Sequence, residues 1–269
     1  MLAHELTDDR CAQAKAGALA TQRVGILLQR KTKLLLACFP VIVGLDAVET
    51  ASVVAGLAVA PARGPLEVFS IMSTETPAIY LARHGETAWS LSGQHTGLTD
   101  LPLTERGERN ARSLGERLKG LTFAKVFTSP LQRARRTCEL AGFGTAVEVD
   151  RDLLEWNYGQ YEGRRTPEIH AERPDWQLFR DGCPGGESPD QVGARADRVV
   201  GQMRSVEGNV LLFSSGHFLR VLAARWLELE PAAGRFFLLS TASLSALGYE
   251  HNRSQPVIRL WDDTRHVGL

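Results

Sequence analysis

An arginine, a histidine and a glycine follow a short apolar run, and these residue types in this order suit phosphate chemistry. The run Ile79–Ala82 has the composition of a buried parallel strand, and Arg83, His84 and Gly85 come directly after it. A neutral imidazole can attack phosphorus and hold the phosphoryl group covalently, while a guanidinium matches the oxygens of the anion. Glycine allows the backbone to approach a substrate closely. Because such a triplet also arises by chance, the prediction that His84 is a nucleophile depends on the rest of the chain.

A basic block follows a second strand-like run. Ala124–Thr128 precedes Ser129 and Pro130. Serine as an N-cap followed by proline predicts a helix start, with Ser129 as the cap, that turns Arg133 toward the same crevice. The other arginines of the block are also compatible with a solvated basic helix face. Since open α/β sheets bind ligands at the carboxyl ends of their strands, we expect Arg133 and His84 in one site.

An aromatic-rich loop with two carboxylates comes next, between Leu154 and Gly163. Desolvation among aromatic side chains raises the pKa of a glutamate, which suits it to donate a proton to a leaving oxygen. Both Glu155 and Glu162 have such neighbours. The loop therefore predicts a general acid, and its spacing alone does not choose between the two glutamates.

Taken in order, these blocks resemble the histidine phosphatase superfamily, also called the phosphoglycerate mutase-like family. The resemblance covers about Ile79 to Trp261 and includes the Arg-His-Gly-Glu-Thr motif, the run Ser92–Thr104, the Ser-Pro-Leu-x-Arg-Ala block and the Glu-x-x-Tyr-Gly block. Within the superfamily the chain is most similar to small sugar-phosphate phosphatases of the sedoheptulose-bisphosphatase-like branch. That branch also carries Glu-Trp-x-Tyr-Gly-x-Tyr-Glu-Gly and the Arg-Asp-Gly-Cys found here at Arg180–Cys183.

The resemblance implies roles for individual residues. The implied catalytic residues are the phosphohistidine nucleophile His84, the phosphate clamp Arg83 and Arg133, and the general acid and base Glu155. The residues implied to lie near the transferred phosphate or the substrate are Gly85, Glu86, Thr87, Ser90, Thr96, Gly97 and His217. Chemistry of this type needs no metal and no cofactor.

One position departs from the pattern of the family. The motif of the second family histidine aligns through Gly216, Leu219 and Arg220, and Ser215 stands where that histidine is expected. Loss of one preorganised donor to the phosphoryl oxygens costs about 10²–10³ in rate. The hydroxyl of Ser215 can still donate a hydrogen bond, and His217, two residues later, is the alternative replacement. We therefore expect a weakened phosphatase, with a noncatalytic phosphate-binding protein as an alternative.

The composition agrees with a soluble enzyme. The 269 residues are 43% hydrophobic, which suffices for a large core, and 31 basic residues balance 31 acidic ones, so nucleic acid is not expected as a partner. No stable membrane association is expected either. The cysteines form no Cys-x-x-Cys and no metal-ligand spacing, which favours free thiols in a reducing cytoplasm; they are Cys11, Cys38, Cys138 and Cys183. Neither a dinucleotide or Walker motif nor His-Glu-x-x-His occurs, so we predict no cofactor and no metal.

The first 71 residues differ in character from the rest, and we expect them to be a non-native or dispensable extension. Met72 and the polar residues after it resemble a natural start, and the 198 residues that follow (269 − 71) suit one domain over 72–269. An export or membrane signal is one alternative, because basic residues precede the apolar stretch Leu34–Leu45. Twelve residues are too few to span a bilayer, however. A native helical appendage is the other alternative.

From Met72 onward, strand-like and helix-like runs alternate. This order predicts an α/β fold, a three-layer α/β/α sandwich with a mostly parallel central sheet and a small helical cap. The expected strands are 79–82, 124–128, 147–149, 210–213, 242–249 and 257–261. The expected helices are 105–118 and 189–203 with Thr104 and Ser188 as N-caps, 130–141, 166–180 in the cap, and 218–229.

The leading functional hypothesis is a metal-independent phosphomonoesterase that acts on a small sugar phosphate, or a related metabolite, through a phosphohistidine. Phosphoglycerate mutase-type transfer is an alternative. Such mutases resemble one another in a longer insertion after the acid loop, whereas here only Arg164–Cys183 separates Gly163 from Pro184, which favours hydrolysis. The binding-protein alternative is motivated by Ser215. The sequence does not identify the substrate or the oligomeric state.

Overall fold

The apolar runs before the first and last motifs pair as parallel neighbours inside a six-stranded sheet, as β1 (Ile79–Arg83) and β4 (Val210–Ser214). The computed structural model describes residues 76–268. The other strands are β2 (Lys125–Thr128), β3 (Val147–Val149), β5 (Leu244–Tyr249) and β6 (Pro256–Asp263). The order is β3-β2-β4-β1-β5-β6, in which β5 runs antiparallel to both β1 and β6 and the other pairs are parallel. The predicted mostly parallel sheet is therefore confirmed.

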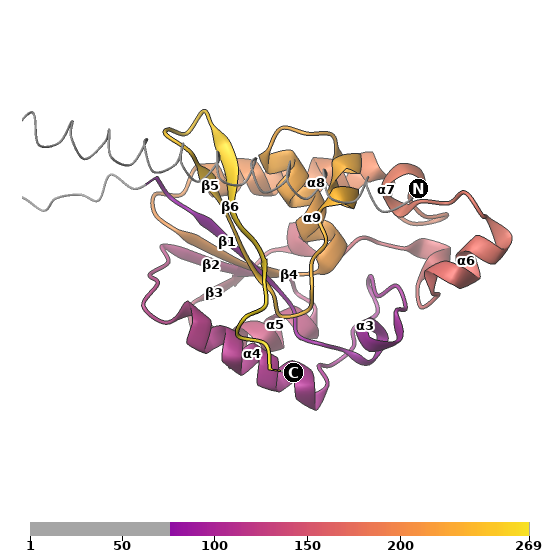
Figure 1. The fold of residues 1–269 in the computed structure, drawn as a ribbon, viewed down its shortest axis with the longest axis horizontal. Helices are drawn as coiled ribbons and strands as arrows, with labels where there is room; N and C mark the ends of the chain where they lie inside the picture. Colours follow the sequence, from indigo (N-terminus) through magenta and orange to yellow (C-terminus); the bar gives the residue numbers. More distant parts are fainter. Residues whose placement is uncertain (1–75, 269) are drawn as a thin grey trace, which may run out of the picture. The chain divides into compact units, whose positions relative to one another are not determined.

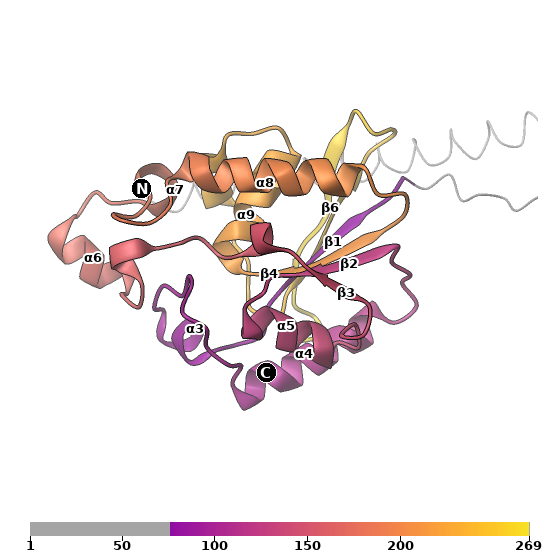
Figure 2. The same cartoon turned by 180° about the vertical axis from the view of Figure 1, so that it is seen from behind.

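Helices cover both faces of the sheet (Figures 1 and 2). The helices α4 (Glu105–Leu118) and α5 (Gln132–Leu140) lie on one face, and α8 (Pro189–Arg204) and α9 (Gly216–Trp226) lie on the other. This arrangement confirms the three-layer α/β/α sandwich.

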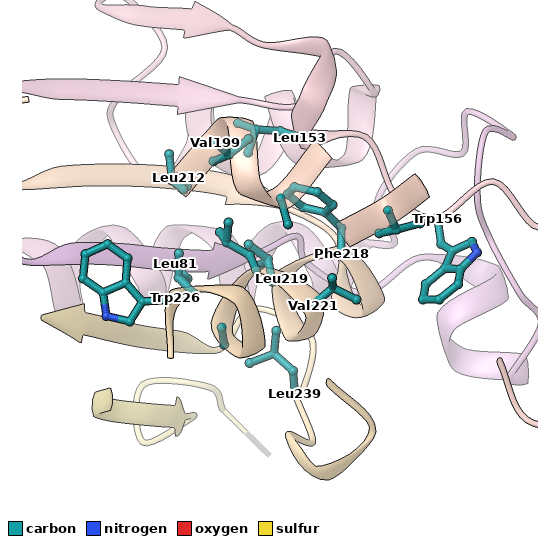
Figure 3. Close-up of a cluster of buried hydrophobic side chains, with 14 of the residues drawn as sticks. Leu81, Leu153, Trp156, Val199, Leu212, Phe218, Leu219, Val221, Trp226 and Leu239 are labelled. Carbon is teal, nitrogen blue, oxygen red and sulfur yellow. The ribbon is translucent and has the colours of Figure 1, made fainter. Parts of the chain in front are cut away.

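The two faces bury alternate residues of the same strands. Leu81 and Leu212 belong to the core cluster that also contains Phe218 of α9 (Figure 3). Their chain neighbours, Ala82 and Phe213, belong to the cluster on the opposite face. Because successive side chains of a strand point to opposite faces, burial on both sides requires a continuous apolar run rather than an alternating one.

The cap consists of shorter elements at one end of the sheet (Figure 1): α3 (Ala88–Ser92), α6 (Thr166–Glu172) and α7 (Leu178–Asp181). The helical cap predicted over 166–180 contains two helices, α6 and α7, separated by residues 173–177. Proline disfavours helical backbone in the residue before it, and α6 ends just before Arg173 and Pro174. Short 3₁₀ turns complete the chain, η1 (Arg151–Leu153), η2 (Gly159–Tyr161) and η3 (Pro231–Phe236).

Helix starts test the capping predictions. Thr104 and Ser188 accept backbone N–H bonds at the starts of α4 and α8, as predicted. The predicted cap Ser129 is wrong, because α5 begins only at Gln132, whose N–H donates to Asp100 Oδ1 at 2.8 Å. A carboxylate distant in sequence thus satisfies the first turn. Helix α9 likewise begins at Gly216, earlier than expected.

The expectations for residues 1–71, and for a start at Met72, lie outside the described residues. Within residues 76–268, no helix combines the length and the apolar composition needed to cross a membrane.

A close backbone contact joins the loop after β1 to the first turn of α4. A Cβ atom on Gly107 would lie 2.2 Å from the carbonyl oxygen of Glu86, and one on Gly85 would lie 2.5 Å from that of Gly107. Glycine at 85 is also required for packing against α4, and its expected role of letting the backbone approach a substrate stays a prediction. This contact fixes the loop that follows His84.

We predict that Gly107→Ala destabilises the protein by about 1–3 kcal/mol, because backbone must shift to admit the methyl group. Gly201→Ala is the matched control, since an added Cβ in this turn of α8 meets nothing within 4 Å. It should instead stabilise the protein by roughly 0.5–1 kcal/mol through helix propensity. Urea unfolding of both variants measures the difference. Equal stability of the two would contradict the packing argument.

Candidate active site

The carboxyl ends of β1 and β4 border a cavity of about 270 Å³. The register that pairs Arg83 with Ser214 brings the first and last motifs together. Of the predicted site residues, those in the cavity wall are Arg83, His84, Ser90, Thr96, Glu155 and His217. The polar convergence in a small concave space is typical of a site for a small molecule.

His84 is held so that one ring nitrogen remains available. Its Nδ1 lies 2.7 Å from the carbonyl oxygen of Gly85, so Nδ1 is the protonated donor and Nε2 carries the lone pair. The backbone N–H of His84 donates to the Ser214 oxygen at 3.0 Å, and its carbonyl accepts the N–H of Ala242 at 3.0 Å. The backbone of the nucleophile candidate is therefore held at both its N–H and its carbonyl group.

The surroundings of His84 keep its ring neutral. Burial lowers the pKa of His84 well below its usual value of 6.5, and the positive charges of Arg133 and Arg83 lower it further. A neutral imidazole is the form that can attack phosphorus.

Arg83 lies between the two strand ends. Its Nη1 donates to the carbonyl of Leu239, and its guanidinium passes close to Gly216, where a Cβ atom would lie 3.1 Å from the Arg83 Cζ. Glycine at 216 thus makes room for the arginine. The Nε of Arg83 is buried without a hydrogen-bond partner. An unpartnered cationic donor in the cavity wall is suited to an anion.

Arg133 is fully buried behind the wall. Its Nη atoms donate to the carbonyl oxygens of Thr96, Gly97 and Thr99 at 2.8–3.1 Å, so Arg133 holds the loop that contributes Thr96 to the cavity. Its Nε, like that of Arg83, is buried without a partner. A direct phosphate contact of Arg133 remains a prediction.

The structure separates the two candidate acids. Glu155 lines the cavity and accepts backbone N–H bonds from Trp156 (2.8 Å), His217 (3.0 Å) and Phe218 (2.8 Å). Glu162 is absent from the cavity wall, and its Oε1 accepts the N–H groups of Gly97 and Thr99 instead. Only Glu155 is therefore placed beside His84 in a common cavity.

Ser215 occupies the N-cap position of α9 without capping it. Its side chain forms no cap bond, and its Oγ is buried without a partner. The two N–H groups that a capping serine accepts, at the second and third helical positions, go to Glu155 instead. The hydroxyl of Ser215 is therefore an uncommitted donor on the residue that precedes Gly216, which lines the cavity.

His217 lies in the wall among aromatic rings. Its Nδ1 is 2.5 Å from the hydroxyl of Tyr158, and its ring centroid is 5.5 Å from that of Phe179 and 6.1 Å from that of His95. Burial lowers the pKa of His217 well below its usual value, as do the charges of Arg220 and His95. The bond to Tyr158 holds the ring in the aromatic group.

The remaining predicted residues lie behind the wall. Glu86 accepts a hydrogen bond from Thr104, Thr87 caps α3 through Ser90, and Gly97 is bound by Arg133. Their contact with substrate stays a prediction. The wall residues that sequence reasoning missed include His95 and Arg220. Both lie inside the family motifs described above, and this was the only feature of the sequence that could have identified them as site residues.

Other reactive groups lie apart from this cavity. Cys138 and Cys183 are free and buried, and burial raises the pKa of each thiol to about 12. The other two cysteines are outside the described residues. Within residues 76–268, no three His, Cys, Asp or Glu side chains converge as metal ligands would.

Comparisons with known proteins identify the family to which the chain belongs. A sequence model of the histidine phosphatase superfamily (branch 1) matches residues 79–264. An acid phosphatase of Mycobacterium tuberculosis is 42% identical over 188 residues, and the match covers 68% of this chain and 92% of that protein. A sedoheptulose 1,7-bisphosphatase of Saccharomyces cerevisiae is 39% identical over an alignment of 191 residues that covers 59% of this chain and 70% of that protein. The solved structure of a Mycobacterium tuberculosis open reading frame has a TM-score of 0.66 and 40% identity, and covers 69% of this chain and 97% of its own.

We predict that the His84 ring stays neutral as the pH falls through 6.5 and is protonated only at lower pH, because its pKa is lowered. The acid limb of kcat/KM that belongs to the nucleophile should then lie below pH 6.5. Histidine-ring NMR signals, assigned by comparison with His84→Ala, follow this titration directly. A His84 midpoint at or above 6.5 would show that burial and the two arginines do not control the ring.

Proposed function

Because the chain belongs to the histidine phosphatase superfamily and is a phosphatase of its branch 1, we propose that it hydrolyses a small phosphorylated metabolite through a phosphohistidine at His84. The observation that carries the proposal is the state of His84, a buried neutral ring with Nε2 unprotonated in a cavity wall. The unpartnered Nε of Arg83 supports it, because a buried cationic donor suits phosphate.

The proposed reaction has two steps. His84 Nε2 attacks phosphorus, the bond from phosphorus to the ester oxygen breaks, and Glu155 gives its proton to the leaving alkoxide. Water then attacks the phosphohistidine, Glu155 takes a proton from that water, and inorganic phosphate leaves with His84 regenerated. Glu155 Oε2 accepts only one of the three backbone N–H bonds and so keeps capacity for this proton.

We propose a phosphorylated sugar as the substrate. The cavity of about 270 Å³ suits a compound of that size. One similar protein is named a sedoheptulose 1,7-bisphosphatase and another an acid phosphatase, which supports hydrolysis of small phosphate esters. The short segment between the acid loop and Pro184 favours hydrolysis over phosphoglycerate mutase-type transfer. A cytoplasmic location and a small-molecule substrate as partner belong to the same proposal.

Incubation with p-nitrophenyl phosphate that carries radioactive phosphorus tests whether His84 is the nucleophile. We expect a covalent label that is stable in base and labile in acid, and His84→Ala should abolish both the label and turnover. His251→Ala is the control, because this exposed histidine lies outside the cavity and its loss should leave the label intact. Full hydrolysis by His84→Ala would refute the assignment.

The serine at position 215, where the family has a histidine, allows a second test of the proposed function. If Ser215 stabilises the phosphoryl oxygens less well than an imidazole, Ser215→His should raise the chemical rate by roughly 10–10³. His217→Ala identifies any compensation: nearly complete loss of turnover, with little gain from Ser215→His, would show that His217 has taken over. A mild effect of His217→Ala is expected, because Tyr158 holds its ring. Absence of turnover in every variant, with micromolar binding of phosphorylated sugars, would favour the binding-protein alternative.

A further inference from the structure

The segment of residues 238–243, which we call the strap, lies against the nucleophile loop. The carbonyl of Leu239 accepts a bond from Arg83 Nη1, and the carbonyl of Ser243 accepts the Arg83 backbone N–H at 3.2 Å. The N–H of Ala242 donates to the His84 carbonyl at 3.0 Å. The strap therefore makes three hydrogen bonds to Arg83 and His84.

The chain after β5 holds the strap from its other side. Trp261 Nε1 donates to the Leu238 carbonyl at 2.5 Å. The carboxylate of Asp262 accepts the N–H of Ser240 at 2.6 Å and its hydroxyl at 3.1 Å. His266 Nε2 lies 2.8 Å from the Ala242 carbonyl oxygen, so it is the protonated donor. Three residues near the C-terminus thus bind the strap.

Two of these residues have a backbone conformation that side chains disfavour. Ala242 has φ 56° and Asp262 has φ 52°, and within residues 76–268 only Glu228 is a further non-glycine with positive φ. Such backbone persists only where surrounding contacts impose it, and it gathers at functional sites. Ala242 is bound at both ends of the residue, by His84 through its N–H and by His266 through its carbonyl.

His266 has no other polar contact to explain its position. Its Nδ1 is buried without a hydrogen-bond partner, so the bond to Ala242 is the polar interaction that its ring makes. Burying a nitrogen without a hydrogen-bond partner costs free energy. That the ring nevertheless holds this position indicates that the hydrogen bond from Nε2 to Ala242 offsets the cost.

We infer that His266 is a positioning residue for the nucleophile: it fixes Ala242, and through Ala242 the backbone of His84. The inference rests on the proposed role of His84. Its physical reason is that the His84 ring is bonded to its own loop, at the Gly85 carbonyl. A shift of that peptide therefore moves Nε2, and a small misplacement of an attacking atom slows the reaction strongly.

The test uses the full-length protein and labelled p-nitrophenyl phosphate, with rapid quenching in base. His266→Ala should slow formation of the covalent label by about 10–10² while the final extent of labelling is unchanged. His266→Gln should restore much of the rate, because its amide can donate to the Ala242 carbonyl. Arg265→Ala is the matched control: Arg265 pairs with Asp263 and makes no bond to the strap, so its variant should label at the normal rate.

Ala242→Gly provides a variant that keeps both backbone bonds and relieves the strained φ, so it should fold normally even if His266→Ala does not. It should label at the normal rate, because it keeps the two backbone bonds through which His266 and Ala242 position His84. A reduced extent of labelling with an unchanged rate constant in His266→Ala would mean lost folded protein only and overturn the inference. So would a normal rate of labelling in His266→Ala. Failure of the unmodified protein to label would instead refute the proposed role of His84, and this inference with it.

Discussion

The rest of the site depends on the hydrogen bonds between the carboxyl group of Glu155 and the first turn of α9. It accepts the N–H groups of His217 and Phe218 in the first turn of α9, although it belongs to a different loop. The loop itself is anchored from behind, because Arg195 donates to the carbonyls of Asp152, Leu154 and Glu155. Since α9 starts where β4 ends, this single carboxylate sets the distance between the acid loop and the strand that neighbours His84.

The buried arginines give the site its charge and its nucleophile at once. Arg83 and Arg133 form no salt bridge within the described residues, and backbone carbonyls satisfy only part of their donors. Burial lowers the pKa of His84, and the positive charges of Arg133 and Arg83 lower it further, so the ring stays neutral. Arg83, which lines the cavity, also keeps an unpartnered Nε that suits an anion. A carboxylate partner for either arginine would weaken both effects.

The sequence predicted what depends on local pattern. The apolar runs of β1 and β4, and the caps Thr104 and Ser188, are local signals, and the structure confirms them. The spacing within the acid loop could not choose Glu155 over Glu162, because that choice depends on which glutamate reaches α9. The failed cap at Ser129 and the strap have the same cause. In each, a hydrogen bond to a residue distant in the chain decides the local structure.

The capping role of Glu155 also explains why Ser215 can differ from the family pattern without a cost to the fold. A serine at an N-cap normally stabilises its helix by accepting the N–H groups of the first turn. Here those groups are already bonded to Glu155, and the Ser215 hydroxyl has no structural partner to lose. The start of α9 therefore does not depend on the side chain at 215. The hydrogen bonds that start α9 would therefore persist if another residue stood at position 215.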